Sequence, residues 1–130
     1  MNLEERCKKA VELKHGSNNC AQAVALSCSD LVEMEPDLLW KLNAGFGGGM
    51  GTMEGTCGAL CGAVLIAGLL TQGERTGAKS GRILRRFKEL SGATACGDLK
   101  KKIDGKPVCD CDDCVRHAVI ALSEVMDLKE

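Results

Sequence analysis

The segment from Cys57 to Thr71 constrains the fold of this chain more than any other, because nearly all of its residues are apolar. A helix that is apolar on every side must be surrounded by other elements, so we predict a central helix here. Its apolar run, residues 59–70, is too short to span a bilayer, and no membrane partner is expected. A glycine-dense loop, residues 45–51, directly precedes this helix.

Capping residues and the helical spacing of apolar side chains divide the rest of the chain into further helices. The predicted helices cover residues 2–15, 18–32, 36–44, 76–91 and 112–127, with a brief turn at 94–99. We expect Ser17 to cap the second helix and Asp110 or Asp112 to cap the last one. No strand alternation is sustained. The sequence therefore predicts a single all-α domain over residues 1–130, a compact bundle of about five to six helices with the glycine-rich loop before the central helix.

Cysteine is the outstanding residue type, with nine copies in 130 residues. The N-terminal segment MNLEERCKKA is charged and lacks the apolar core of a secretory signal, which indicates a cytoplasmic protein. Stable disulfides are rare in the cytoplasm, and an odd number of cysteines argues against a fully paired framework. The cysteines are therefore expected to bind a metal or to act as reactive thiols.

Most of the cysteines fall where they could act together. Four are predicted to lie at helix starts, where the partial positive charge of the helix stabilises a thiolate: Cys20, Cys57, Cys96 and Cys114. Three more stand at ligand spacing from these positions, namely Cys61, Cys109 and Cys111. We predict these seven as metal ligands or reactive thiols, and interpret Cys7 as incidental and Cys28 as a core residue.

The glycine loop does not match a dinucleotide-binding fingerprint. Met50 and Thr52 occupy positions that require glycine, and no strand precedes the loop. Two interpretations stay open: a plain flexible turn, or a backbone that passes close to a sulfur or an anion and donates amides to it. On the second interpretation, Gly47, Gly48 and Gly49 are candidate cofactor-binding residues.

The formal net charge of −1 is unevenly spread. Residues 75–106 contain ten basic and three acidic side chains, which form either a solvated surface or a docking surface for an acidic redox partner. The chain has no tyrosine and little other aromatic content, so no nucleic-acid partner is expected. Because one small domain does not readily cover an apolar helix on all sides, a homodimer is a further expectation.

Three segments carry a resemblance to a known family. They are Asn19-Cys20-Ala21-Gln22-Ala23-Val24, Gly45-Phe46-Gly47-Gly48-Gly49-Met50-Gly51 and Thr56-Cys57-Gly58-Ala59-Leu60-Cys61-Gly62-Ala63. With Cys96 and Cys114 downstream, the chain resembles the C_GCAxxG_C_C family of redox-active proteins over residues 5–126. The resemblance implies a small helical domain with an iron–sulfur or other redox role, whose characteristic cysteines here are Cys20, Cys57, Cys96 and Cys114. The cysteines at 61, 109 and 111 look additional, which leaves open a larger cluster, a second site or a disulfide relay.

Three functions therefore remain open. The first is an electron-transfer module in which the four family cysteines hold an iron–sulfur cluster. The second is a thiol–disulfide oxidoreductase in which Cys57 attacks and Cys61 or Cys114 resolves. The third is a zinc-binding structural or interaction module. Only the second is an enzyme, and the sequence contains no Ser-His-Asp group or phosphate-binding loop that would indicate another enzyme class.

Overall fold

The computed structural model describes residues 1–128, most of which are helical. Its α-helices are α1 (Leu3–His15), α2 (Cys20–Ser27), α3 (Pro36–Leu42), α4 (Gly58–Leu70), α5 (Thr76–Ser91), α6 (Cys96–Lys100) and α7 (Cys111–Val125). The all-α prediction is confirmed. The brief turn expected at 94–99 is instead a short helix, α6, and short irregular turns of helix connect α3 to α4.

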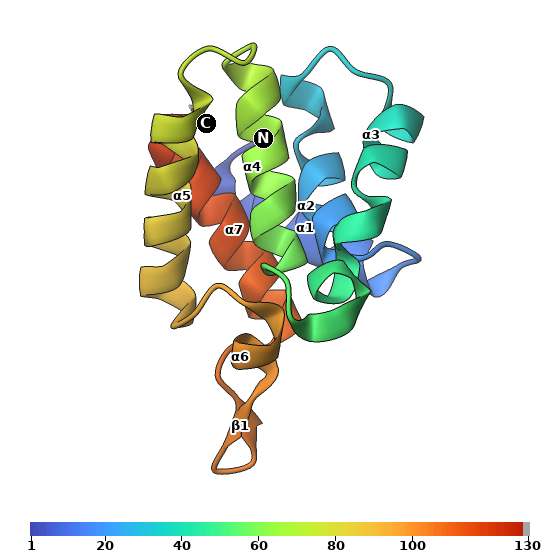
Figure 1. Ribbon diagram of the computed structural model, residues 1–130. Helices are drawn as coiled ribbons and strands as arrows, with labels where there is room; N and C mark the ends of the chain where they lie inside the picture. The colour runs from blue at the N-terminus through green and yellow to red at the C-terminus, as the bar shows by residue number, and fades with distance from the viewer. Residues whose placement is uncertain (129–130) are drawn as a thin grey trace.

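Helix α4 lies in the middle of the bundle, between α5 on one side and α2 on the other (Figure 1). Its residues Leu60 and Ile66 are buried in one core with Phe87 of α5 and Leu122 of α7. Helix α2 packs so closely that a Cβ atom on Gly62 would lie 2.6 Å from a backbone carbonyl oxygen of α2. The predicted central position is confirmed for this buried side of α4. Across residues 1–128, no helix is both long and apolar enough to cross a membrane.

The second helix is shorter than predicted at both ends. Asn19, not Ser17, caps it, and the side chains of Asn19 and Gln22 each accept a hydrogen bond from the other's backbone amide. The helix stops at Ser27, whose carbonyl oxygen accepts a hydrogen bond of 2.6 Å from the buried guanidinium of Arg6. Arg6 also pairs with Asp30 at 2.7 Å, so residues 29–31 form a separate turn.

A two-stranded hairpin interrupts the helical pattern where the sequence predicted only a loop. Strands β1 (Lys102–Ile103) and β2 (Lys106–Pro107) pair antiparallel around Asp104 and Gly105, and both of these turn residues have positive φ angles, as a two-residue hairpin turn requires. The hairpin projects from the body beside α6 (Figure 1). Helices α2, α4, α6 and α7 all begin at this end of the bundle, so their first residues converge.

Candidate redox site at four helix starts

Five cysteines lie at these converging helix starts. Cys20 and Cys96 are the first residues of α2 and α6, and Cys57 is the capping residue of α4. Cys111 is the first residue of α7, and Cys114 lies in its first turn. The helix-start positions predicted for Cys20, Cys57, Cys96 and Cys114 are confirmed, and Cys111 joins them. We refer to these five residues as the cysteine cluster.

Cys20 and Cys111 form the more exposed part of the cluster, which we call the outer pair. The Cys20 thiol donates a hydrogen bond to the Cys111 sulfur, and this bond lowers the pKa of Cys111 to about 5. Burial opposes the shift, while a hydrogen bond from Lys100 adds to it. The same contact raises the pKa of Cys20, which keeps its proton. Both residues are half-buried, so the outer pair reaches the surface.

Cys57 and Cys114 form a buried inner pair, with exposed fractions of 4% and 0%. A hydrogen bond from the Cys114 thiol lowers the pKa of Cys57 to about 7 against the effect of burial, and the amides of Leu60 and Ala59 and the charge of Lys100 also lower it. The side chain of Cys57 makes no capping hydrogen bond. The start of α4 therefore stabilises the Cys57 thiolate through the dipoles of its oriented backbone amides. The contact between the two cysteines, together with burial, raises the pKa of Cys114.

Lys100, the last residue of α6, supplies a cation at the centre of the cluster. Burial alone would lower its pKa, but the hydrogen bond to Cys111 and the charges of nearby sulfurs raise it instead. Its own charge helps to lower the pKa of Cys57. At Cys96, burial raises the pKa, and the charge of Lys100 offsets part of that rise. Sequence reasoning treated Lys100 only as part of the basic segment. The signal that could have found it is its spacing of four residues from Cys96 on one short helix.

Cys109 lies behind the inner pair and is buried. The Cys114 sulfur is 3.8 Å from the carbonyl oxygen of Cys109, and the Cys109 sulfur is 3.7 Å from Nδ1 of His117. The same Nδ1 atom is 2.8 Å from the hydroxyl oxygen of Ser91 on α5. Burial lowers the pKa of His117 and raises that of Cys109. The Ser91 and His117 contacts were not predicted, because only the packing of α5 on α7 creates them.

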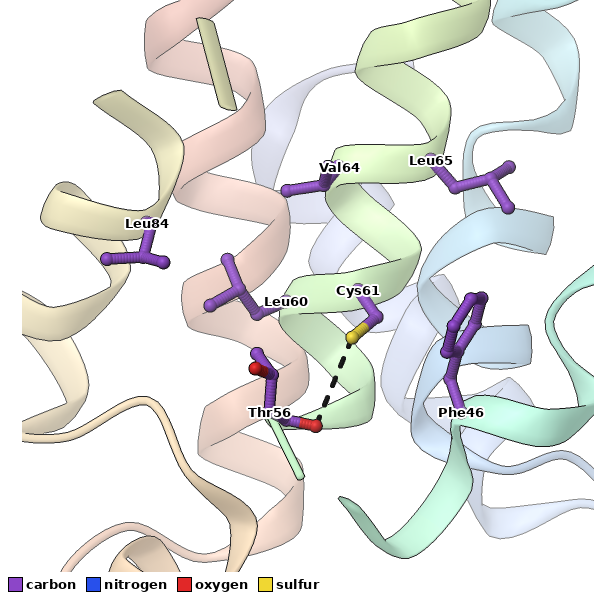
Figure 2. Close-up of a pocket in the computed structure, with 7 residues that line it drawn as sticks. All are labelled: Phe46, Thr56, Leu60, Cys61, Val64, Leu65 and Leu84. Atoms are coloured by element: carbon purple, nitrogen blue, oxygen red, sulfur yellow. Dashed lines mark hydrogen bonds between the residues drawn. The ribbon is translucent and has the colours of Figure 1, made fainter. Parts of the chain in front are cut away.

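Cys61, predicted together with the others, lines a separate cavity, although the charge of Cys57 still reaches it. Figure 2 shows its side chain in an apolar cavity of about 340 Å³, where the Cys61 thiol lies 3.9 Å from the carbonyl oxygen of Thr56. Burial raises the pKa of Cys61. Cys28 is fully buried in the core, as interpreted from the sequence, and Cys7 is half-buried on α1. The structure thus brings together six of the seven predicted cysteines, in the cluster or directly behind it.

The glycine loop closes over the cluster. A Cβ atom on Gly47 would lie 2.7 Å from the side chain of Asn19, and one on Gly49 would lie 2.6 Å from Cβ of Cys96. Gly49 also has a φ of +60°, which favours glycine. Gly48 has a positive φ as well, but it faces open space. Steric fit explains why glycine occupies positions 47 and 49. The cofactor-binding role of Gly47, Gly48 and Gly49 stays a prediction.

The donor atoms of the cluster suit a soft metal or an iron–sulfur centre, because they are sulfurs beside a cation. Their arrangement, however, is pairwise. Within residues 1–128, no group of three or more His, Cys, Asp or Glu side chains is placed to hold a metal ion. All nine cysteines are free of disulfide bonds. The contacts between the cysteines of the cluster are therefore those of paired thiols.

One protein-family model matches the part of the chain that contains this site. The family model described as "Putative redox-active protein (C_GCAxxG_C_C)" matches residues 18–125, which include the whole cysteine cluster. No curated protein and no solved structure matches the chain.

Proposed function

We propose that this chain, which belongs to the C_GCAxxG_C_C family of redox-active proteins, is a thiol–disulfide oxidoreductase that reacts through its outer pair. The observation that carries the proposal is the state of Cys111. This residue is half-exposed at a helix start, and both the Cys20 thiol and the Lys100 ammonium stabilise its anion. A thiolate that is accessible and has a second thiol beside it is the arrangement that disulfide exchange requires.

The reaction proceeds in two exchanges. The Cys111 thiolate attacks one sulfur of a partner's disulfide, which forms a mixed disulfide and releases the other partner sulfur as a thiolate. Cys20 then gives its proton to that thiolate and attacks the Cys111 sulfur. This second step forms the Cys20–Cys111 disulfide and releases the remaining partner thiolate, which takes a proton from water. Two electrons pass from the outer pair to the partner, whose disulfide becomes a dithiol.

The inner pair supplies a second dithiol. The charge of Cys57 acts on Cys20, so the two pairs lie within electrostatic reach of each other. Because Cys57 and Cys114 are buried, a partner protein reaches them only through the outer pair. In the proposed relay, the reduced inner pair exchanges with an oxidised outer pair, which restores the outer dithiol and leaves the inner pair as a disulfide.

This proposal changes the roles that the sequence suggested for an oxidoreductase. Cys57 was expected to attack, yet it is almost fully buried, and Cys61 was expected as one resolving residue, yet it faces a separate cavity. Cys111, which the family pattern treats as additional, combines exposure with a lowered pKa. The relay therefore keeps Cys57 with Cys114 but moves the first attack to Cys111.

An iron–sulfur centre is the second candidate. The observation that favours it is that the cluster has more cysteines than a dithiol site requires. A dithiol needs only two sulfurs, yet Cys96 also lies within electrostatic reach of both Cys57 and Cys111. Cys20, Cys57, Cys96 and Cys114 would hold such a cluster, which would supply one-electron exchange. The zinc alternative has less support, since a structural zinc ion needs four ligands around one point.

We propose that the redox partner docks at the hairpin end of the molecule. The basic segment 75–106 is divided between two places: the cations of α5 and those of the hairpin region. Of these, Lys101, Lys102 and Lys106 are exposed, and they follow Lys100, which contacts the outer pair. An acidic partner is expected here, as the sequence suggested, with the hairpin in place of the whole segment as its docking surface.

Purification without oxygen, followed by one kinetic comparison, tests the proposal. Iron, inorganic sulfide and zinc are measured per chain, and the reduced protein is then mixed with 5,5′-dithiobis(2-nitrobenzoate). We expect a colourless, metal-free protein with one fast-reacting thiol that Cys111→Ser removes, whereas the control Cys7→Ser keeps it. Iron and sulfide in stoichiometric amounts with visible absorption would favour the second candidate, and a fast phase that survives in Cys111→Ser would contradict the first.

A further inference from the structure

We propose that Cys109 is a third exchanging thiol of the inner site, where it displaces Cys57 from the disulfide with Cys114 and so makes the relay run in one direction. The inference rests on the proposed thiol–disulfide function and adds a residue to it. It concerns the inner site alone, because Cys109 has no part in the two exchanges of the outer pair.

The start of α7 holds Cys109 against Cys114. Asp110 is the capping residue, so Cys109 directly precedes the cap and Cys114 is the fourth residue of the helix. Side chains at these two positions often pack against each other at helix starts. The Asp110 carboxylate accepts a hydrogen bond of 2.8 Å from the amide of Asp113, which fixes the cap. The amide of Cys109 donates a hydrogen bond of 3.0 Å to the carbonyl oxygen of Leu99, which fixes the residue before it.

The Cys114 sulfur therefore has two sulfur neighbours. Its thiol has hydrogen-bonding contacts with both Cys57 and Cys109, and it lies 3.8 Å from the carbonyl oxygen of Cys109. The three side chains belong to one buried core, and Cys109 is only 6% exposed. Since one sulfur forms one disulfide at a time, Cys57 and Cys109 compete for Cys114.

The exchange is an isomerisation of the inner disulfide. Once Cys57 and Cys114 are joined, the Cys109 sulfur attacks the Cys114 sulfur. The Cys109–Cys114 bond forms, the Cys57–Cys114 bond breaks, and Cys57 leaves with the electron pair as a thiolate. The proton of Cys109 passes to Nδ1 of His117, which lies 3.7 Å from its sulfur. One disulfide replaces another, so the step needs no oxidant or reductant.

The surroundings of the two competing sulfurs favour the release of Cys57. Burial opposes a thiolate at both positions, but at Cys57 two backbone amides at the start of α4 and the charge of Lys100 act against it. At Cys109 one hydroxyl group acts against the effect of burial, whereas the carboxylates of Asp110 and Asp113 add to it. The better stabilised thiolate is the better leaving group, so Cys57 leaves more readily than Cys109.

The isomerisation separates the oxidised inner site from the outer pair. Cys57 is an inner residue whose charge acts on Cys20, so the Cys57–Cys114 disulfide is the form that can exchange back with the outer dithiol. Cys109 instead lies behind the inner pair, beside His117. A Cys109–Cys114 disulfide therefore retains the oxidised state inside the protein and leaves the outer dithiol free for another partner.

A time course of disulfide mapping tests this step. The anaerobically purified chain receives two equivalents of oxidised glutathione, is kept without oxygen, and is quenched with acid at intervals before mapping by mass spectrometry. We expect Cys57–Cys114 to form at the inner site and then to be replaced by Cys109–Cys114, while Cys57 becomes a free thiol. The Cys20–Cys111 disulfide is expected to stay unchanged during this replacement.

Two variants show whether Cys109 is the attacking residue. Cys109→Ser should keep the Cys57–Cys114 disulfide throughout, and circular dichroism checks that this variant is folded. Cys61→Ser is the matched control, because Cys61 lies one helical turn after Cys57 but lines the separate cavity. It should rearrange as the wild type does. Dithiothreitol added after the rearrangement should reduce one disulfide rapidly in the wild type and two in Cys109→Ser.

The outcomes separate this inference from the function on which it rests. A Cys57–Cys114 disulfide that persists in the wild type, or one that is lost equally fast in folded Cys109→Ser, would overturn the role of Cys109 and leave the redox proposal intact. Failure to form any Cys20–Cys111 disulfide would contradict the proposed function itself, and the role of Cys109 with it.

Discussion

The thiol of Cys20, at the start of α2, donates a hydrogen bond to the sulfur of Cys111, at the start of α7. The two residues are far apart in the sequence, and only the packing of these helices at one end of the bundle joins them. Beside Cys111, the contact between α1 and α7 includes His15, whose ring nitrogen Nε2 lies 2.8 Å from the carboxylate of Asp112. The packing of these helices therefore places the accessible thiolate of Cys111 beside the thiol of Cys20.

Replacing Cys20 with alanine tests what this hydrogen bond contributes. A hydrogen bond to a charged group contributes about 1.5–3 kcal/mol, so its loss should raise the pKa of Cys111 by about 1–2 units. The pH dependence of alkylation by iodoacetamide, followed at Cys111 by mass spectrometry, measures this shift. Cys7→Ala serves as the control and should leave the profile of Cys111 unchanged.

Lys100→Met should raise the pKa of Cys111 independently, because it removes both a hydrogen bond and a positive charge from that sulfur. We expect a shift of about 1 unit, with a slower reaction of Cys111 at pH 6. Lys101→Met is the matched control, since Lys101 is the neighbouring residue and is exposed. Equal alkylation profiles for the two variants would show that Lys100 does not stabilise the thiolate.

The stability of the reduced protein should increase with pH. The folded pKa of Cys111, about 5, lies below the ordinary value of 9.0, so the unfolded chain binds more protons between these two pH values. The free energy of unfolding is therefore expected to rise from pH 5.5 to pH 8 and to fall as the pH drops towards 5. Urea denaturation at both pH values measures it. Cys111→Ser should show a smaller rise, while His117 contributes equally to both proteins.

Two neighbouring glycines offer a matched test of the loop above the cluster. Gly49→Ala combines a positive φ with a Cβ atom 2.6 Å from that of Cys96, whereas Gly48→Ala adds a Cβ atom to open space at a similar φ. We expect a loss of about 3 kcal/mol of stability for Gly49→Ala and about 1 kcal/mol for Gly48→Ala. Thermal unfolding measures both, and equal losses would show that contact with Cys96 has no cost.

Much of the helical framework could be predicted from local signals. Gly16 ends α1 and Asp110 caps α7, because both act within a few residues of their own position. The end of α2 could not be predicted in this way, since Arg6 of α1 determines it through its contacts with Ser27 and Asp30. The hairpin was missed although Asp104-Gly105 is a known turn pair, because its strands are only two residues long.

The cysteine site was predictable as a group but not as pairs. The helix-start rule found Cys20, Cys57, Cys96 and Cys114, because each follows a local boundary. Which sulfur faces which depends on how α2, α4 and α7 are rotated against one another, and the sequence holds no local signal for that. For the same reason Cys61 was grouped with Cys57 by spacing, although its side chain lines the cavity between Phe46 and Leu84 (Figure 2).

The order in which disulfides form tests the central claim most directly. Anaerobically purified protein is titrated with oxidised glutathione, trapped with an alkylating agent at each step, digested and mapped by mass spectrometry. The account predicts that a Cys20–Cys111 disulfide forms first and a Cys57–Cys114 disulfide second. A first disulfide between any other cysteines, or a protein that forms none because iron and sulfide occupy the cluster, would contradict it.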